Sequence, residues 1–270
     1  MSAGKDSNHS AYSAPIVSKA MKVLKMIATS GRNPGISEIA SKLSLAKSTT
    51  HGILAALEET GWVLRDPVTR KYTCGYTAKD IAGKADVRLP IVEKARPHLR
   101  RLAADLDEDV FLAISTGHHL LIVDQMESAK DLKITARPGT RLSIFAGAAG
   151  KIFLAHQDRE TVSRLLRSKS IPQFTQGSIT DPTLYVAELD RVRERGVAQD
   201  IAEYLTNVWC VALPIFYGKK NRRRMVASFW VVGINSAVTQ QRMEAAERLG
   251  RATCEAISRT ITHYNQDESS

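Results

Sequence analysis

The hydrophobic pattern between residues 36 and 57 predicts two helices joined by a tight turn. Apolar residues recur at helical spacing from Ile36 to Leu43 and again from Thr50 to Leu57. Leu45 falls between these segments, where the periodicity breaks. The apolar positions of the second helix share one face, which we expect to be buried, with Thr50 pointing inward.

The second helix also begins with polar residues on its opposite face. Lys47, Ser48 and His51 lie there, with Thr49 beside them. A helix that is anchored by its C-terminal half and exposes short polar side chains at its start fits the major groove of DNA. We expect Ser48 and His51 to reach base edges, Lys47 to meet phosphate and Thr49 to serve either role. Periodicity alone leaves an ordinary helical hairpin as the alternative.

Two segments with strand-like alternation follow the helices. They cover residues 62–65 and 71–74, and the turn-forming stretch from Asp66 to Arg70 joins them. This order of elements is typical of a winged helix, in which the hairpin forms the wing. We expect Arg70 and Lys71 at the tip of the wing to contact the DNA backbone.

The charge distribution favours nucleic acid as a partner of the first third of the chain. The formal net charge is +10 over 270 residues. Residues 1–85 contain 12 Lys and Arg against 6 Asp and Glu, whereas residues 86–270 contain 26 against 22. Basic charge is thus densest around the predicted helices, as phosphate binding requires. The basic run from Gly218 to Arg224 is more simply explained as a solvated hairpin tip.

The rest of the chain predicts an α+β domain after a junction near residues 78–90. Helices are expected at about 86–106, 146–156, 158–168, 182–195 and 239–264, and strands at 110–115, 120–125, 132–136, 208–217 and 225–234. Pro97 should kink the first of these helices or restart it. We expect Asp181 to cap the helix that starts at Pro182. Strands 208–217 and 225–234 should form a hairpin, as should the two strands on either side of His118-His119. We therefore expect an antiparallel sheet with helices on its faces, which is an α+β architecture.

Short motifs also occur in a recognisable order along the chain. They are Ser18-Lys19-Ala20, Ser37-Glu38-Ile39-Ala40, Lys47-Ser48-Thr49, Gly61-Trp62-Val63, Leu99-Arg100-Arg101-Leu102-Ala103, Gly139-Thr140-Arg141-Leu142, Gly150-Lys151-Ile152-Phe153-Leu154-Ala155, Arg195-Gly196-Val197-Ala198, the segment from Asp200 to Cys210 and the segment from Ser228 to Gly233. With these motifs, residues 14–262 resemble the IclR family of bacterial transcriptional regulators, and residues 16–75 resemble its winged-helix domain.

The resemblance implies a domain organisation. Residues 1–13 would be a disordered tail, and residues 14–78 a winged helix-turn-helix domain in which Lys19 also meets the DNA backbone. Residues 79–106 would form a linker and linker helix. Residues 107–264 would form a GAF-like domain that binds a small-molecule effector.

The resemblance also places an effector pocket in the second domain. Matching the motifs residue by residue assigns Leu142, Phe145, Gly147, Ala148, Asp200, Cys210 and Trp230 to it. Asp200 and Cys210 match polar ligand contacts of carboxylate-sensing relatives. Trp230 stands where the family often has a small hydroxyl residue, and Phe145 where a histidine is common. Both departures favour an apolar or aromatic effector, with simple core packing of the two rings as the alternative.

The function that these observations favour is a ligand-responsive transcriptional regulator of a catabolic operon. Its partners would be a palindromic double-stranded DNA operator, a small organic effector and further copies of the chain, as a homodimer or homotetramer. The alternative is an enzyme or stand-alone sensor that uses Cys210, which has no histidine nearby in sequence to activate it.

Several classes of protein are disfavoured by composition. Apolar runs such as 229–234 are far shorter than the ~20 residues of a membrane helix, and the polar start lacks a signal-peptide core. The three cysteines are far apart, which fits a reducing cytoplasm. We expect a cytoplasmic protein with no membrane partner, cofactor, metal site or catalytic residue.

Overall fold

The computed structural model describes residues 14–84, 89–117, 119–218 and 223–267. The chain divides into two compact units, Met1–Val87 and Arg88–Ser270. The tail expected at residues 1–13, His118 at an expected hairpin tip and residues 219–222 of the basic run lie outside the described residues. Within the described ranges, no helix combines the length and hydropathy needed to cross a bilayer.

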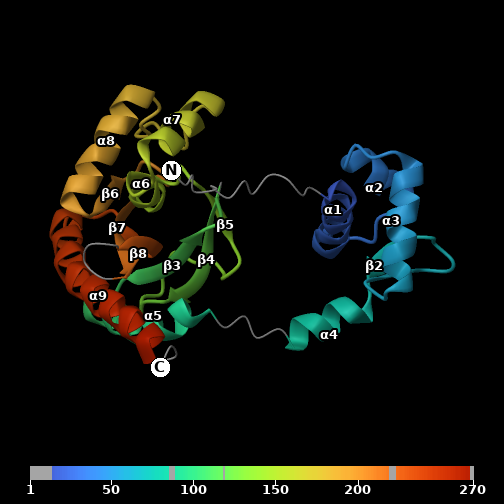
Figure 1. Ribbon diagram of the computed structural model, residues 1–270, viewed down its shortest axis with the longest axis horizontal. Helices are drawn as coiled ribbons and strands as arrows, with labels where there is room; N and C mark the ends of the chain where they lie inside the picture. Colours follow the sequence, from blue (N-terminus) through green and yellow to red (C-terminus); the bar gives the residue numbers. More distant parts are fainter. Residues whose placement is uncertain (1–13, 85–88, 118, 219–222, 268–270) are drawn as a thin grey trace, which may run out of the picture. The chain divides into compact units, whose positions relative to one another are not determined.

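The N-terminal unit confirms the predicted winged helix-turn-helix. Its elements run in the order α1 (Pro15–Thr29), α2 (Ile36–Lys42), α3 (Lys47–Glu59), β1 (Val63–Arg65) and β2 (Tyr72–Cys74) (Figure 1). The two strands pair antiparallel, and each starts one residue later than predicted. The apolar faces of these elements meet in a core formed by Val23, Ile27, Ile39, Ile53, Leu54, Val63 and Tyr72.

The tip of the wing, formed by the turn between β1 and β2, comes earlier in the chain than Arg70 and Lys71. The Asp66 carboxylate accepts hydrogen bonds from the backbone N–H groups of Val68 and Thr69, at 2.9 and 2.6 Å. These bonds hold the pKa of Asp66 below its ordinary value. At the turn itself, Val68 is 87% exposed. Arg70, with a φ of 59°, turns the chain back toward β2, so Arg70 and Lys71 flank the tip and do not form it.

The junction between the units is more helical than predicted. The helix α4 (Tyr76–Lys84) covers the first part of the junction expected near residues 78–90, where small residues such as Ala78 and Gly83 occur. Because alanine favours helix, a segment rich in small residues can be helical and need not be a loop. After it, α5 (Pro90–Leu106) continues through Pro97 without restarting and ends at Asp107, whose φ is 48°. The helix start predicted at residue 86 lies outside the described residues.

The second unit is built on an antiparallel sheet, as predicted. Its strands are β3 (Asp109–Ser115), β4 (His119–Met126), β5 (Arg141–Ser143), β6 (Ala198–Ile201), β7 (Val208–Tyr217) and β8 (Arg224–Ile234). Their order across the sheet is β5-β4-β3-β8-β7-β6. The helices of this unit after α5 are α6 (Gly147–Ala155), α7 (Arg159–Ser168), α8 (Pro182–Arg195) and α9 (Thr239–Asp267). Asp181 caps α8 as predicted, because its carboxylate accepts from the N–H groups of Thr183 and Leu184.

The strand predicted at 132–136 is wrong, and side chains explain why. The buried carboxylate of Asp109 accepts the backbone N–H groups of Ser128 and Ile134, each at 2.8 Å. The Gln125 side chain donates to the Ile134 carbonyl and accepts from the Ala136 N–H, both at 3.3 Å. The segment is therefore extended and well bonded without a neighbouring strand.

The sheet separates two hydrophobic cores (Figure 1). On one face α6, α7 and α8 pack against residues such as Phe111, Cys210 and Trp230. On the other face α5 and α9 pack against residues such as Leu112 and Val211. Side chains alternate between faces along a strand, so neighbouring residues of β3, β7 and β8 belong to different cores.

Candidate functional site

The start of α3 exposes the polar side chains that the sequence indicated. Lys47, Ser48 and His51 are exposed, and Thr49 is half-buried. Thr50 is fully buried, and its hydroxyl donates to the Ala46 carbonyl at 3.0 Å. The inward face of α3 is fixed in the core, which leaves the first turns free to enter a groove.

The other predicted DNA contacts are also at the surface of the N-terminal unit. Lys19 is exposed on α1, and Arg70 and Lys71 are exposed beside the tip of the wing. The sequence did not single out Val68, although its position after Asp66-Pro67 makes it a turn residue. An exposed apolar side chain at this place can contact sugar carbons in a groove.

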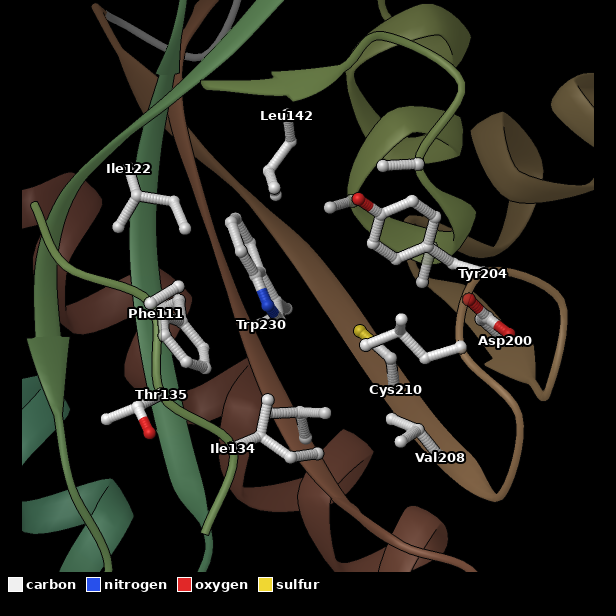
Figure 2. A pocket seen from close by; sticks show the side chains of 16 residues that line it. Phe111, Ile122, Ile134, Thr135, Leu142, Asp200, Tyr204, Val208, Cys210 and Trp230 are labelled. Atoms are coloured by element: carbon white, nitrogen blue, oxygen red, sulfur yellow. The ribbon is translucent and has the colours of Figure 1, made fainter. Parts of the chain in front are cut away.

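The second unit contains a cavity of about 200 Å³ on the face of the sheet that carries α6. The ring of Trp230 lines it and stacks on that of Phe111, with centroids 5.6 Å apart and planes at 19°. This contact follows from strand register, because Phe111 of β3 pairs with Trp230 of β8. Figure 2 shows Asp200, Tyr204 and Cys210 together on one side of the cavity, across the Trp230 ring from Phe111.

The structure brings together five of the seven residues assigned to the pocket from sequence. These are Leu142, Ala148, Asp200, Cys210 and Trp230. Phe145 and Gly147 instead line a much smaller neighbouring void. The Phe145 ring packs edge-on against Tyr185 of α8, with centroids 5.8 Å apart, so it adds no aromatic surface to the main cavity.

Other lining residues were missed by the sequence reasoning. They are Phe111, Ile122, Ile134, Thr135, Ala136, Ala146, Ala149, Tyr204, Leu205, Val208 and Val232. Four of them, Phe111, Ile122, Val208 and Val232, are strand residues whose alternation was visible, but the side of the sheet that each faces depends on pairing between distant strands. The others lie in α6 or in loops, where no periodicity marks them. The walls of the cavity are thus mainly apolar, and its polar groups are on the side chains of Thr135, Asp200, Tyr204, Cys210 and Trp230, whose indole N–H is a donor.

Asp200 is the buried polar anchor of the cavity. Burial raises the pKa of its carboxyl group. Hydrogen bonds from the backbone N–H groups of Glu203, Tyr204 and Ala148, and the nearby charge of Lys151, oppose that rise. The bond from Glu203 is 2.7 Å long. The carboxylate is thus held in place before any ligand arrives.

A buried ion-pair cluster lies behind this anchor, and the sequence reasoning did not foresee it. The Lys151 side chain is 1% exposed, and its Nζ lies 2.7 Å from Glu203 and 3.5 Å from Glu188. Burial raises the pKa of Glu203, and the charge of Lys151 opposes the rise. A Gly-Lys motif within an apolar helix was the available signal, since a lysine there needs acidic partners.

Comparison with known proteins places these two units in one family. The IclR helix-turn-helix domain model matches residues 16–67, and the model of the bacterial transcriptional regulator IclR C-terminal domain matches residues 84–259. The chain belongs to the IclR family of bacterial transcriptional regulators. It is 35% identical over 198 residues to the HTH-type transcriptional regulator BhcR of Paracoccus denitrificans, which covers 73% of this chain and 71% of BhcR.

Further IclR-family proteins match along most of the chain. The transcriptional repressor IclR of Escherichia coli is 27% identical, covering 84% of this chain and 82% of that repressor. An IclR transcriptional regulator from Alicyclobacillus acidocaldarius has a similar structure, with a TM-score of 0.73, 26% identity, and coverage of 93% of this chain and 100% of that one. An IclR homolog from Microbacterium hydrocarbonoxydans, solved with 4-hydroxybenzoate, shares the fold, with a TM-score of 0.70, 21% identity, and coverage of 91% and 98%.

Membership of the IclR family decides against the enzyme alternative, since these curated relatives are transcriptional regulators. The environment of Cys210 agrees. Burial raises the pKa of its thiol well above the ordinary value, and none of the described residues that line the cavity is a histidine. The described residues contain no group of three or more His, Cys, Asp or Glu side chains arranged to hold a metal ion.

Proposed function

We propose that this IclR-family regulator binds a palindromic operator as a homodimer or homotetramer and responds to a small organic, preferentially aromatic, metabolite from a catabolic pathway. Ser48 and His51 read base edges, and Lys19, Lys47, Arg70 and Lys71 hold the DNA through phosphate. Thr49 serves either role. The effector occupies the cavity around Trp230. Because its target is the chromosome, the protein works in the cytoplasm.

An exposed apolar surface on the N-terminal unit supports the oligomer. Ile16, Val17 and Met21 of α1 are 55–56% exposed, and Tyr76 of α4 is 77% exposed. Apolar side chains grouped on one helix favour burial against a partner. A second copy of the chain is the partner we propose, because a palindrome requires two recognition helices related by two-fold symmetry.

The cavity supports the effector, and it is the observation that carries this proposal. Small-molecule sites are concave and mainly apolar, with a few fixed polar groups, as this one is. An apolar cavity of ~150 Å³ is enough for benzene, so about 200 Å³ accepts one substituted ring. The Microbacterium relative, solved with 4-hydroxybenzoate, supports an aromatic ligand of this size.

The test is operator binding with and without effector, measured by fluorescence anisotropy on the promoter DNA beside the gene. Candidate effectors are metabolites of the pathway that the neighbouring genes encode. Effector coupling should change operator affinity by ~5–150-fold. Trp230→Ala should abolish the response and leave ligand-free operator binding near normal. Trp230→Phe keeps an aromatic ring and should retain part of the response.

Thermal melts must accompany these titrations, because Trp230 is only 5% exposed and its truncation opens the core. A folded Trp230→Ala protein that responds like the parent would remove the effector from this cavity. A parent that ignores every pathway metabolite would count against effector control itself.

A further inference from the structure

Tyr204 brings a hydroxyl group to the cavity. Its half-buried ring lines the cavity beside Asp200, and Figure 2 shows the ring extending from the loop after β6 toward Leu142. The Asp200 carboxylate already accepts backbone N–H groups, whereas the Tyr204 hydroxyl has no hydrogen-bond partner among the described residues. Desolvation raises the pKa of this phenol. The hydroxyl therefore stays protonated at neutral pH and can both donate and accept a hydrogen bond.

The loop that carries Tyr204 is held by the segment between α7 and α8. The Thr175 hydroxyl reaches the carbonyls of Ala202 and Glu203, at 2.6 and 3.0 Å. The Ser178 hydroxyl donates to the Glu203 carbonyl at 2.7 Å. Ala202 has a φ of 57°, a left-handed conformation that costs free energy in a residue other than glycine. Such a backbone persists only where its surroundings hold it, and the hydrogen bonds from Thr175 and Ser178 do so.

Neighbouring residues also fix the direction of the Tyr204 ring. Phe174 packs edge-on against it, with centroids 4.8 Å apart and planes at 75°. On the side of α6, Gly147 provides the room that the ring needs, because a Cβ atom there would lie 3.1 Å from the Cβ of Tyr204. A tyrosine side chain has only two torsions, so a ring held between these contacts presents its hydroxyl at one place in the cavity.

From these observations we propose that Tyr204 determines effector specificity by hydrogen bonding to a hydroxyl substituent on the ring of an aromatic effector. An effector without that substituent leaves the Tyr204 hydroxyl desolvated and without a partner, so it binds more weakly. Phe174 and Thr175 are positioning residues, because they hold Tyr204 and are not among the described residues that line the cavity. This inference rests on the proposed role of the cavity as the effector site.

The test uses benzoate, 3-hydroxybenzoate and 4-hydroxybenzoate, which share a ring and a carboxylate and differ in one hydroxyl group. In isothermal titration of the full chain, one of the two hydroxybenzoates should bind about three- to tenfold more tightly than benzoate, as one hydrogen bond provides. Tyr204→Phe keeps the aromatic ring and should abolish this advantage, with little change in benzoate affinity. Tyr185→Phe should retain the advantage and is the matched control. The Tyr185 hydroxyl also lacks a hydrogen-bond partner among the described residues, but it lies at the smaller neighbouring void.

A pair of substitutions at Thr175 tests the positioning role. Thr175→Val removes the hydroxyl at nearly constant shape and should reduce the advantage of the hydroxybenzoate. Thr175→Ser keeps the hydroxyl and should preserve it. The ratio of the two affinities distinguishes this role from a general loss of stability, which would weaken both ligands alike. An unchanged ratio in Thr175→Val would show that Thr175 does not position Tyr204.

The role of Tyr204 would be overturned by any of three results. These are no preference for either hydroxybenzoate in the parent, no binding of any probe, or an advantage that persists in folded Tyr204→Phe. If Tyr204→Phe does not fold, the parent titrations and the Thr175 pair still decide. Failure of the proposed function is distinct, because it appears in the operator assay as a lack of response to pathway metabolites.

Discussion

At the scale of single residues, the start of α3 combines two kinds of proposed DNA contact that substitution can separate. Lys47→Ala should weaken binding to all sequences about equally, because phosphate contacts carry no sequence information. Ser48→Ala or His51→Ala should relax discrimination at one half-site position by ~1–3 kcal/mol. Anisotropy titrations on the operator and on single-base variants of it measure both effects.

Lys42→Ala is a matched control for the loss of one positive charge. The Lys42 Nζ already bonds to Glu38 at 2.9 Å on α2, so its removal should weaken binding less than that of Lys47. A Lys47→Ala protein with unchanged affinity but altered base preference would reverse the roles assigned to these residues.

Some of the residues that line the cavity could be predicted from the sequence, and others could not. Asp200, Cys210 and Trp230 were found through the family motifs, and the structure places all three in the lining. Phe145 was misplaced because its ring direction depends on Tyr185, forty residues further along the chain. Phe111 was missed because its side of the sheet is set by pairing with β8, which no local pattern reveals.

At the scale of elements, the extended segment 127–136 forms a wall of the cavity that is held by side chains. Asp109→Asn keeps the shape but replaces one acceptor oxygen with an amide N–H group, which leaves a buried backbone N–H unpaired. The expected loss in the free energy of unfolding is ~1–3 kcal/mol. Effector affinity should fall as well, because Ile134 and Thr135 line the cavity. Denaturant titration and effector binding measure the two effects.

Glu127→Gln provides the comparison within the same segment. Glu127 is 48% exposed and pairs with Lys133 at 3.1 Å on the surface, so this change should alter stability by less than ~1 kcal/mol. Equal losses in the two variants would show that the Asp109 bonds do not hold the wall.

Elements with a complete local signal were predicted well. The helix-turn-helix, the β7–β8 pair and α8 with its Asp181 cap all have periodicity, turns or caps within a few residues. The failures were elements whose partners are distant. The 132–136 run has strand-like composition, yet Asp109 and Gln125 take the bonds that a neighbouring strand would make.

At the scale of the whole molecule, we expect salt-sensitive operator binding that depends on the oligomer. A dimer with ~6–10 phosphate contacts loses ~10³–10⁵ in affinity between about 50 and 200 mM salt. Met21→Glu places a charge on the exposed apolar face of α1 and should shift the chain toward monomer and weaken operator binding. Analytical ultracentrifugation and anisotropy measure these two quantities.

Ala28→Glu adds the same charge at an exposed position near the other end of α1, so it controls for general repulsion of DNA. If both variants remain dimeric and lose equal affinity, α1 does not form the interface. Operator affinity that stays constant across the salt range would contradict phosphate binding altogether.

The division of the sheet into two faces has an evolutionary consequence. Along β3 and β8, Phe111 and Trp230 lie on the side of the sheet with the proposed effector cavity, whereas their neighbours Leu112 and Val231 pack beneath α5 and α9. Substitutions at alternate positions can therefore change the ligand that the proposed cavity accepts without changing the packing of α5, the helix that follows the DNA-binding unit in the chain. A few substitutions in the strands can in this way give a descendant protein a new effector, while the connection between its two units stays the same.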